Sequence, residues 1–403
     1  MNRYIYKARD SKSGAIIKGV IQAENERAAG KLLIERGYTP DTVTEDTSGD
    51  SFFDKFKNKV TTKDKIVFTR QFSTLIGAGL PLSNSLRVLI EQTESKPMRR
   101  VTESILADVE AGKSLTQACA KFPDVFNRIY LALLKAGESS GTLDKSLRRL
   151  ADQQEKDHAM VMRIKNSLTY PAIVLAVIIA VLVFMVIAVV PQVQQLYHDL
   201  GKDLPMITKL LVEQTNFLVN MWWLVTIVIG LTIYFVFQFV RTDSGRHVLA
   251  RIKLNIPVFK SMFWRLYNGR FARTAENLLS TGVSIQDTLA ISAEAINNLI
   301  MEEEIKDVSE KVKQGKTLSA SLKELDYILP LLPQMAAIGE ESGKIDEMLG
   351  KAANVYEDEL DQQINTISTL IEPIMLVIMA LMVAVIIAGV LMPIYQLVSQ
   401  IQK

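Results

Sequence analysis

Two short segments combine glycine, lysine and a hydroxyl residue, the residue types that build phosphate-binding loops. They are "GKS" at residues 112–114 and "GKT" at residues 315–317. A nucleotide-binding loop also needs a glycine five residues before the Gly-Lys pair, after a buried strand, so that backbone N–H groups surround the phosphates. Those positions hold Ala107 and Glu310 in polar, helix-like segments. We therefore expect helix connections here, with Ser114 capping a helix, and no ATP site.

The other residues that could support catalysis do not form a recognisable site. His158, His198 and His247 are far apart and lie near no cysteine or suitably spaced carboxylate, so metal catalysis has no support. No histidine can be paired with a nucleophilic serine or cysteine. Cys119 is the single cysteine, so we expect a buried structural thiol and no disulfide. The sequence predicts no catalytic residue, no metal and no cofactor.

One polar segment occurs twice, as "GESSGTLD" at residues 137–144 and "GEESGKID" at residues 339–346. Glycine at a helix end, serine or threonine at the start of the next helix, and aspartate in its first turn are typical of a capped turn between helices. We expect Gly137 and Gly339 to end one helix, and Ser140 or Thr142, and Ser342, to cap the next.

Capping does not explain Glu138 and Glu340, because a carboxylate is slightly unfavourable at a helix C-terminus. Two interpretations remain open: an ion pair with an arginine inside the helical domain, which we favour together with capping, and a contact with a basic surface of a partner. The second interpretation makes both turns candidate partner-docking sites, with these residues: Gly137, Glu138, Ser140, Gly141, Gly339, Glu340, Ser342 and Gly343.

The repeat extends well beyond this turn. "FTRQFSTLIGAGL" from Phe68 aligns with "FARTAENLLSTGV" from Phe271, and after one deletion the alignment pairs Pro171 with Pro373. Apolar residues recur at helical spacing, so we expect roughly six short helices per copy. The last helix of the first copy should begin near Leu143 and run through Pro171.

Three apolar segments follow the helical parts. Residues 172–190 and 374–392 contain no polar side chain, and residues 221–239 contain few. About 20 apolar residues cross a bilayer core, so we predict membrane spans at 171–191, 218–240 and 373–392. Ionisable groups within spans mark transport pathways, and the first and third spans have none. We therefore interpret the spans as anchors.

Lysine and arginine in the flanks predict the orientation. Residues 241–273 carry eight Lys or Arg and one acid, whereas residues 191–218 carry two Lys and three acids. We therefore place the N-terminus and the helical domains at 62–170 and 241–372 in the cytoplasm. The loop at 192–217 and the tail at 393–403 should be extracytoplasmic.

The N-terminal segment has a different character. Residues 1–45 predict a small α+β domain, with a hairpin that turns at Ser13-Gly14 and a helix over residues 25–36. No cleaved signal peptide is expected, and residues 46–61 look like a linker. The net charge of +2 is too small to indicate direct nucleic-acid binding.

Together these patterns resemble the type II secretion F-protein family, which includes inner-membrane platform proteins of type II secretion and of type IV pilus assembly. The resemblance covers nearly the whole chain. It rests on the two Gly-Glu-x-Ser-Gly turns, the three spans and the motif residues of the N-terminal segment: Tyr6, Ala8, Asp10, Gly14, Gly19, Ala29, Leu33, Gly37 and Pro40.

The resemblance implies a multimeric, non-enzymatic scaffold in the inner membrane. The implied partners are a hexameric assembly ATPase, pilin or pseudopilin subunits, other inner-membrane assembly proteins, further copies of the chain and membrane lipid. The expected fold is a mainly α membrane protein with two repeated cytoplasmic six-helix bundles, three transmembrane helices and a small N-terminal α+β domain. A DNA-uptake platform in the same family and a membrane transporter or channel subunit are the alternatives.

Overall fold

The structure is a computed structural model that describes residues 2–10, 16–23, 26–35, 38–45, 59–199, 209, 212–213, 217, 221–257, 259–392 and 394–395. The chain divides into two compact units. One contains residues 1–64 and 93–100, and the other contains residues 65–92 and 101–403. Each is described by itself.

The first unit contains a three-stranded antiparallel sheet in the order β2-β1-β3. Tyr6 of the central strand pairs with Gly19 on one side and Val43 on the other, and the register against β3 shifts between Lys7 and Ala8. The predicted turn at Ser13-Gly14 and most of the predicted linker lie outside the described residues. The elements are β1 (Asn2–Asp10), β2 (Ile16–Ala23), α1 (Glu26–Glu35) and β3 (Tyr38–Glu45).

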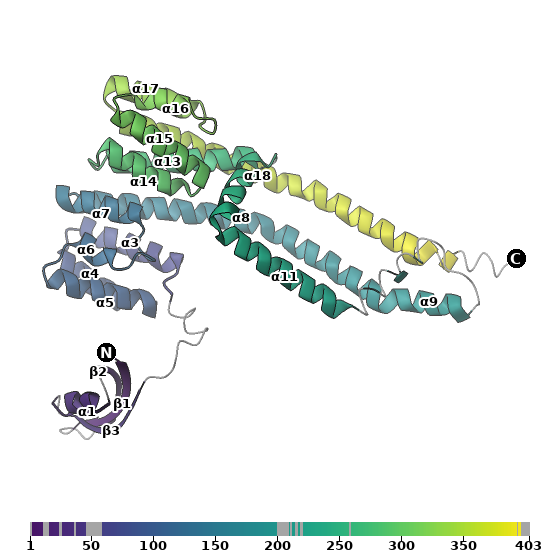
Figure 1. Ribbon diagram of the computed structural model, residues 1–403, viewed down its shortest axis with the longest axis horizontal. Helices are drawn as coiled ribbons and strands as arrows, with labels where there is room; N and C mark the ends of the chain where they lie inside the picture. The colour runs from purple at the N-terminus through teal and green to yellow at the C-terminus, as the bar shows by residue number, and fades with distance from the viewer. Residues whose placement is uncertain are drawn as a thin grey trace. The chain divides into compact units, whose positions relative to one another are not determined.

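The repeat reappears as two series of helices (Figure 1). The first copy comprises α3 (Thr62–Gly77), α4 (Leu82–Gln92), α5 (Lys96–Glu110), α6 (Leu115–Ala120), α7 (Arg128–Ser140) and α8 (Leu143–Phe184), of which α3 and α5 begin in the first unit. The second comprises α13 (Lys260–Leu279), α14 (Ile285–Ile296), α15 (Leu299–Lys313), α16 (Leu318–Lys323), α17 (Leu331–Ser342) and α18 (Ile345–Ile386).

Each copy buries an apolar core. In the first copy the rings of Phe68 and Phe126 lie 6.1 Å apart, and Phe126 contacts Tyr130 at 4.8 Å between centroids. In the second copy Phe271, the partner of Phe68 in the repeat, is fully buried in a cluster that includes Leu349 of α18. A fully buried large apolar side chain contributes about 1.5–3 kcal/mol, so these cores hold each copy together.

Three helices in the described part of the chain are long and apolar enough to cross a membrane. The first is a continuous 57-residue helix, Leu143–Asp199, made of α8, η1 (Met185–Val189) and α9 (Val190–Asp199). At 1.5 Å per residue it is about 85 Å long. The others are α11 (Trp222–Arg241) and α18, which continues into η2 (Ile387–Leu391). The prediction of a membrane protein is confirmed.

Both long helices contain their predicted proline, as expected from the sequence: α8 passes through Pro171 and α18 through Pro373. Each also contains a five-residue π-helix shortly before the next proline of the repeat, at residues 185–189 and at residues 387–391. Because π-helices are rare, their recurrence at equivalent positions shows that the repeat includes the spans.

Candidate functional site

The repeated turn joins α7 to α8 and α17 to α18. The prediction that Gly137 and Gly339 end the preceding helices is wrong. Both glycines lie within those helices. The helices end instead at Gly141 and Gly343, whose φ angles of +71° and +69° are in the left-handed region that favours glycine. Sequence spacing could not distinguish the two glycines of each turn.

Gly137 and Gly339 have a different role, because the next helix passes very close to them. A Cβ atom at Gly137 would lie 2.4 Å from Ser146 Oγ, and one at Gly339 would lie 2.7 Å from the Cα of Ile345. No side chain fits at either position without movement of α8 or α18. The two glycines therefore set the close packing of α7 on α8 and of α17 on α18.

The expectation that Ser140 and Ser342 cap the following helix is also wrong. Ser140 Oγ donates to the carbonyl of Ala136, and Ser342 Oγ donates to the carbonyl of Ile338, both at 2.7 Å. Thr142 precedes α8 but makes no side-chain cap. These hydroxyls bond back into their own helix because the left-handed glycine directs the chain away.

The aspartates of the turn lie where the sequence predicts. Asp144 is in the first turn of α8 and Asp346 is in the first turn of α18. A carboxylate is favoured there by the positive end of the helix dipole.

Glu138 points at the start of a neighbouring helix of its own copy. Its carboxylate accepts hydrogen bonds from the backbone N–H of Leu115 at 2.7 Å, from the N–H of Thr116 at 3.1 Å and from Thr116 Oγ1 at 2.7 Å. These N–H groups belong to the first turn of α6, where no intrahelical acceptor exists. The negative charge is therefore stabilised by a helix N-terminus and not by the predicted arginine.

Glu340 repeats this geometry in the second copy. It accepts from the N–H of Leu318 at 2.5 Å, from the N–H of Ser319 at 3.3 Å and from Ser319 Oγ at 2.5 Å. Both glutamates are half-buried. An internal role thus accounts for the glutamate in both copies, while docking of a partner at the turns stays a prediction.

The "GKS" and "GKT" segments are helix connections, as predicted. Gly112 ends α5 with a φ of +87°, and Ser114 forms a capping box with Gln117 at the start of α6. Lys113 Nζ lies 2.7 Å from Asp108 Oδ1, and with Lys121 it holds the pKa of Asp108 below its usual value. The lysine of this segment is therefore paired inside the protein. Thr317 caps α16 by accepting from the N–H of Ala320, without a capping box.

Cys119 is buried in α6, which confirms the prediction of a structural thiol. Burial raises its pKa to about 12, with a smaller contribution from the charge of Glu138. Because the thiolate is the reactive form, this cysteine is chemically inert near neutral pH. Among the described residues, no group of three or more His, Cys, Asp or Glu side chains is arranged to hold a metal ion.

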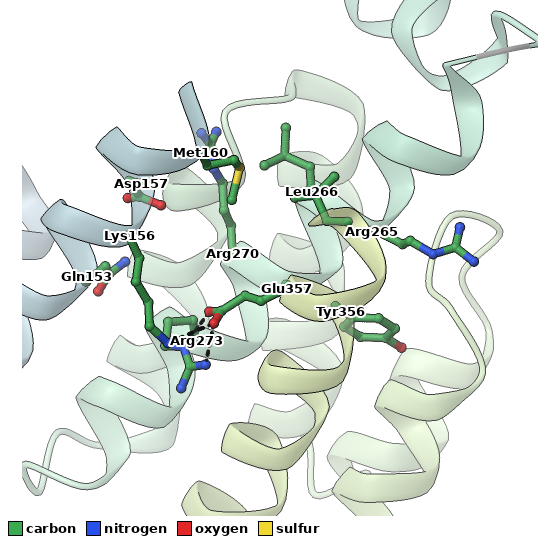
Figure 2. Close-up of a pocket in the computed structure, with 12 residues that line it drawn as sticks. Gln153, Lys156, Asp157, Met160, Arg265, Leu266, Arg270, Arg273, Tyr356 and Glu357 are labelled. Atoms are coloured by element: carbon green, nitrogen blue, oxygen red, sulfur yellow. Dashed lines mark hydrogen bonds and ion pairs between the residues drawn. The ribbon is translucent and has the colours of Figure 1, made fainter. Parts of the chain in front are cut away.

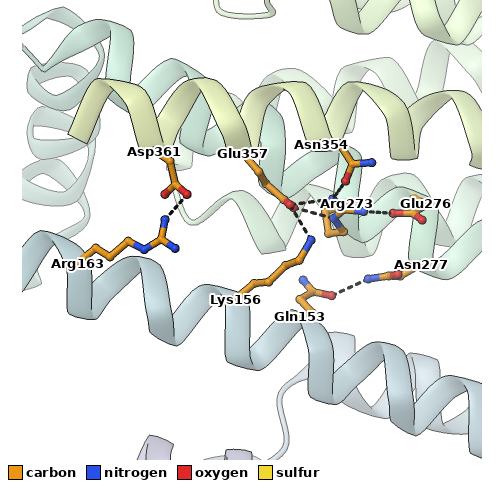
Figure 3. Close-up of polar contacts among 9 residues, drawn as sticks. All are labelled: Gln153, Lys156, Arg163, Arg273, Glu276, Asn277, Asn354, Glu357 and Asp361. Carbon is orange, nitrogen blue, oxygen red and sulfur yellow. Dashed lines mark hydrogen bonds and ion pairs between the residues drawn. The ribbon is translucent and has the colours of Figure 1, made fainter. Parts of the chain in front are cut away.

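Sequence reasoning missed a second feature, a seam where α8 of the first copy lies against α13 and α18 of the second. Figure 3 shows its polar contacts. Lys156 Nζ is 2.9 Å from Glu357 Oε2, and Asn277 donates to Gln153 at 2.9 Å. Two further ion pairs between described residues also cross the copies, Arg163–Asp361 and, between α7 and α14, Arg128–Glu294.

Apolar contacts are interleaved with these ion pairs along α8 and α18. Met160 and Ile164 of α8 pack against a cluster of Met262, Leu360 and Ile364. With Lys156 and Arg163, the α8 residues recur every three or four positions, the spacing of one helical face. This spacing was visible in the sequence, but nothing there indicated which face of α8 another helix covers.

Arg273 is the central cation of the second copy's part of the seam. It bonds both oxygens of Glu357 at 2.7 and 2.8 Å and also bonds Glu276 at 2.7 Å. Burial acts to raise the pKa of Glu357, but the bonds from Arg273 and Lys156 outweigh it and hold that pKa below its usual value. The seam is therefore strongest where Glu357 is ionised.

Asp157 lines a small pocket in the seam, together with Arg270 and Lys156 (Figure 2). Burial raises the pKa of Asp157, and the charge of Arg270 partly opposes this effect. The charged groups of the seam mostly neutralise one another, so the arrangement is suited to holding two domains together.

These features define a class, a membrane protein in which a duplicated helical domain continues directly into its spans. The chain belongs to the family described as type II secretion system protein F. The profile of its repeated domain matches residues 68–191 and 271–393, and the profile of its N-terminal domain matches residues 1–44. The resemblance seen in the sequence is thereby confirmed.

Relatives in both branches of the family resemble the chain over most of its length. A type IV pilus assembly protein PilC of Thermus thermophilus is 34% identical, with 98% of each chain covered. A type II secretion system protein F of Pseudomonas aeruginosa is 32% identical, covering 98% of this chain and 99% of the relative. One from Vibrio cholerae is 30% identical, with 98% of each covered.

Proposed function

We propose that this chain is the inner-membrane platform of a type II secretion or type IV pilus assembly machine. In this proposal it couples a hexameric cytoplasmic assembly ATPase to the polymerisation of pilin or pseudopilin subunits. The names of the relatives in both branches support the general role. The chain itself would be a non-enzymatic scaffold.

The continuity of the long helices is the observation that carries this proposal. α8 starts two residues after Gly141 and continues as one helix to Asp199, and α18 starts two residues after Gly343. A displacement applied at either turn therefore reaches the membrane without passing through a loop. The ion pairs of the seam would make the two helices move together.

The finer architecture is part of the same proposal. Each copy would form a six-helix bundle on the cytoplasmic side, residues 1–45 would form a separate α+β domain, and the C-terminal tail would be extracytoplasmic. The connecting span α11 restores the orientation, so that both copies face the ATPase. Other inner-membrane assembly proteins and further copies of the chain would complete the platform.

Docking of the ATPase at the repeated turns can be tested without disturbing the glutamates that bond α6 and α16. Ser139 and Glu341 occupy equivalent exposed positions beside those glutamates. A variant with Ser139→Arg and Glu341→Arg changes the charge of both turns. A control with Glu103→Arg and Asp358→Arg changes exposed charges elsewhere in the two copies.

The measurement is affinity purification from native membranes in mild detergent, followed by mass spectrometry of co-purifying proteins. We expect an assembly ATPase and pilin-like proteins with the unmodified chain and the control, and loss of the ATPase alone with the turn variant. Retention of the ATPase by the turn variant would contradict docking at the turns but leave the platform role intact. Absence of both partners, in detergent that preserves other membrane complexes, would contradict the platform role and favour the transporter class.

A further inference from the structure

A rigid corner connects the second span to the second copy. Thr242 is the single residue between α11 and α12 (Asp243–Asn255), and it caps α12 by accepting from the N–H of Gly245 at 3.1 Å. A Cβ atom at Gly245 would lie 1.8 Å from the carbonyl oxygen of Phe239, so only glycine fits this approach. Because only one residue intervenes, α12 begins directly at the end of the apolar helix α11.

α12 has apolar residues on two opposite faces. Ala250 and Leu254 are buried, and Asn298 Nδ2 fixes this side by donating to the carbonyl of Ala250 at 3.2 Å. On the opposite side Val248 and Ile252, four residues apart, are 46% and 45% exposed. A helix covered only by water would not need this second apolar strip.

The segment that follows α12 exposes further apolar residues, and the region carries an excess of cations. Ile256 and Phe259 are exposed in the connection to α13. Residues 241–260 contain five Lys or Arg and one acid, Asp243. Arg251 lies beside the strip and is exposed. Apolar residues that enter the headgroup boundary, with cations beside them, are the pattern of helices that lie on anionic membranes.

We propose that α12 lies in the surface of the bilayer that α11 spans. Val248 and Ile252 enter the boundary between headgroups and acyl chains, and Arg251 contacts the phosphates of anionic lipids. We assign lipid, and not another protein, to the exposed apolar face of α12, because the short connection to the span α11 keeps α12 next to the membrane. The same contact holds the second copy at a fixed distance from the bilayer.

The test uses the full chain in lipid nanodiscs with a nitroxide at Ile252→Cys. The native Cys119 does not compete for the label, because it is buried and its pKa is raised to about 12. Ile338→Cys on α17 is the matched control, since Ile338 is also an exposed isoleucine. Collision of the nitroxide with oxygen, which partitions into lipid, is compared with collision with a water-soluble nickel chelate. The discs are neutral phosphatidylcholine, with or without phosphatidylglycerol at about one third.

We expect the label at 252 to collide several-fold more with oxygen, relative to the nickel chelate, than the label at 338. This preference should be larger in discs with phosphatidylglycerol. It should fall several-fold when Arg251→Gln is added, and inorganic phosphate should not change it. Equal access of the nickel chelate to both labels would overturn the proposal.

Two other outcomes would also overturn it. A lipid-like signal that is the same in both kinds of disc would contradict the role assigned to anionic lipid. If inorganic phosphate alone changed the collision preference of the label at 252 in neutral discs, the cations would bind a free anion and not a lipid headgroup.

Discussion

The two copies contain the same internal ion pair in different surroundings. Arg70 bonds both oxygens of Glu155 at 2.6 and 2.7 Å, as Arg273 bonds Glu357 in the second copy. The side chains of Arg70 and Glu155 are 35% and 44% exposed, whereas those of Arg273 and Glu357 are 15% and 25% exposed. The difference arises because α8 covers the second copy, whereas the described helices of the same compact unit do not cover the first pair in this way.

Charge explains why the contact is not repeated. The position of the repeat that corresponds to Lys156 is Asp358, which is exposed on α18. If α18 covered the first copy as α8 covers the second, Asp358 would face Glu155, and two carboxylates would repel. The duplicated domains therefore form one asymmetric contact within the chain.

Other positions show that the repeat keeps an interaction even when the residues change. Asp108 of α5 bonds Lys113 and Lys121, whereas its counterpart Lys311 bonds Glu324, the counterpart of Lys121. The ion pair between the two elements is kept with its signs reversed. Electrostatic attraction at this place is therefore what the fold requires, and not a particular acid or base.

The largest effect should come from the glycines of the turns. Gly339→Ala brings a methyl group against the backbone of Ile345, which cannot rotate away, so we expect the second copy to lose about 3 kcal/mol. Gly137→Ala meets mainly the side chain of Ser146 and should cost about 2 kcal/mol in the first copy. Hydrogen exchange of the full chain in detergent, read separately for α17 and α7, measures both losses.

The control for these variants is Gly230→Ala in α11, where no atom lies within 4 Å of a new Cβ. It should leave protection in both copies unchanged. Equal protection of α17 in Gly339→Ala and in the unmodified chain would contradict the close packing.

The next largest effect should be the difference in stability between removing the Arg273–Glu357 pair and removing the Arg70–Glu155 pair. Removing one partner of a half-buried, bidentate pair leaves an unpaired charge, so Arg273→Gln should lower the stability of the second copy by about 2 kcal/mol. Arg70→Gln should cost the first copy less than about 1 kcal/mol, because exposed pairs contribute little. The readout is the thermal midpoint of the purified chain. Lys156→Gln, which removes only the contact from α8 to Glu357, measures how much of the loss in stability comes from the seam. Equal shifts for Arg70→Gln and Arg273→Gln would show that covering by α8 does not matter.

The smallest effect concerns a position where the copies differ in polarity. Glu304 of α15 corresponds to the buried Val101 of α5, and its Oε2 is buried without a hydrogen-bond partner. Burial raises the pKa of Glu304 to about 7, and Asp326 and Asp307 contribute to the rise. Because the folded pKa exceeds the ordinary value of 4.5, the charged form destabilises the fold above pH 7.

Glu304→Gln should therefore raise the free energy of unfolding by on the order of 1 kcal/mol at about pH 8.5, after allowance for solvent screening. The gain should decrease as the pH falls through 7 and vanish below 4.5. Thermal midpoints of both proteins across this range check the sign. A gain that is independent of pH would assign it to packing and not to ionisation.

The sequence was sufficient for the features that depend on local composition. The apolar spans, the repeat and the run of α8 through Pro171 follow from residue types and spacing alone. The partner of Glu138 could not be predicted, because it is a backbone N–H of Leu115, and backbone groups have no sequence signature. The place of Gly137 depends on how closely α8 approaches, which is a property of tertiary packing. The seam between α8 and the second copy could not be predicted either, because it also depends on tertiary packing.

The π-helix before Pro191 changes the direction in which side chains beyond it point around the axis of the first span. Ile178, Val190, Val193 and Tyr197 are all buried. On a uniform helix Ile178 and Val190 would point about 120° apart, but the one extra residue that a π turn accommodates reduces this to about 20°. A cross-linking map phased on a straight helical wheel would therefore be displaced by one position beyond residue 185, and the same offset applies to the third span beyond residue 387.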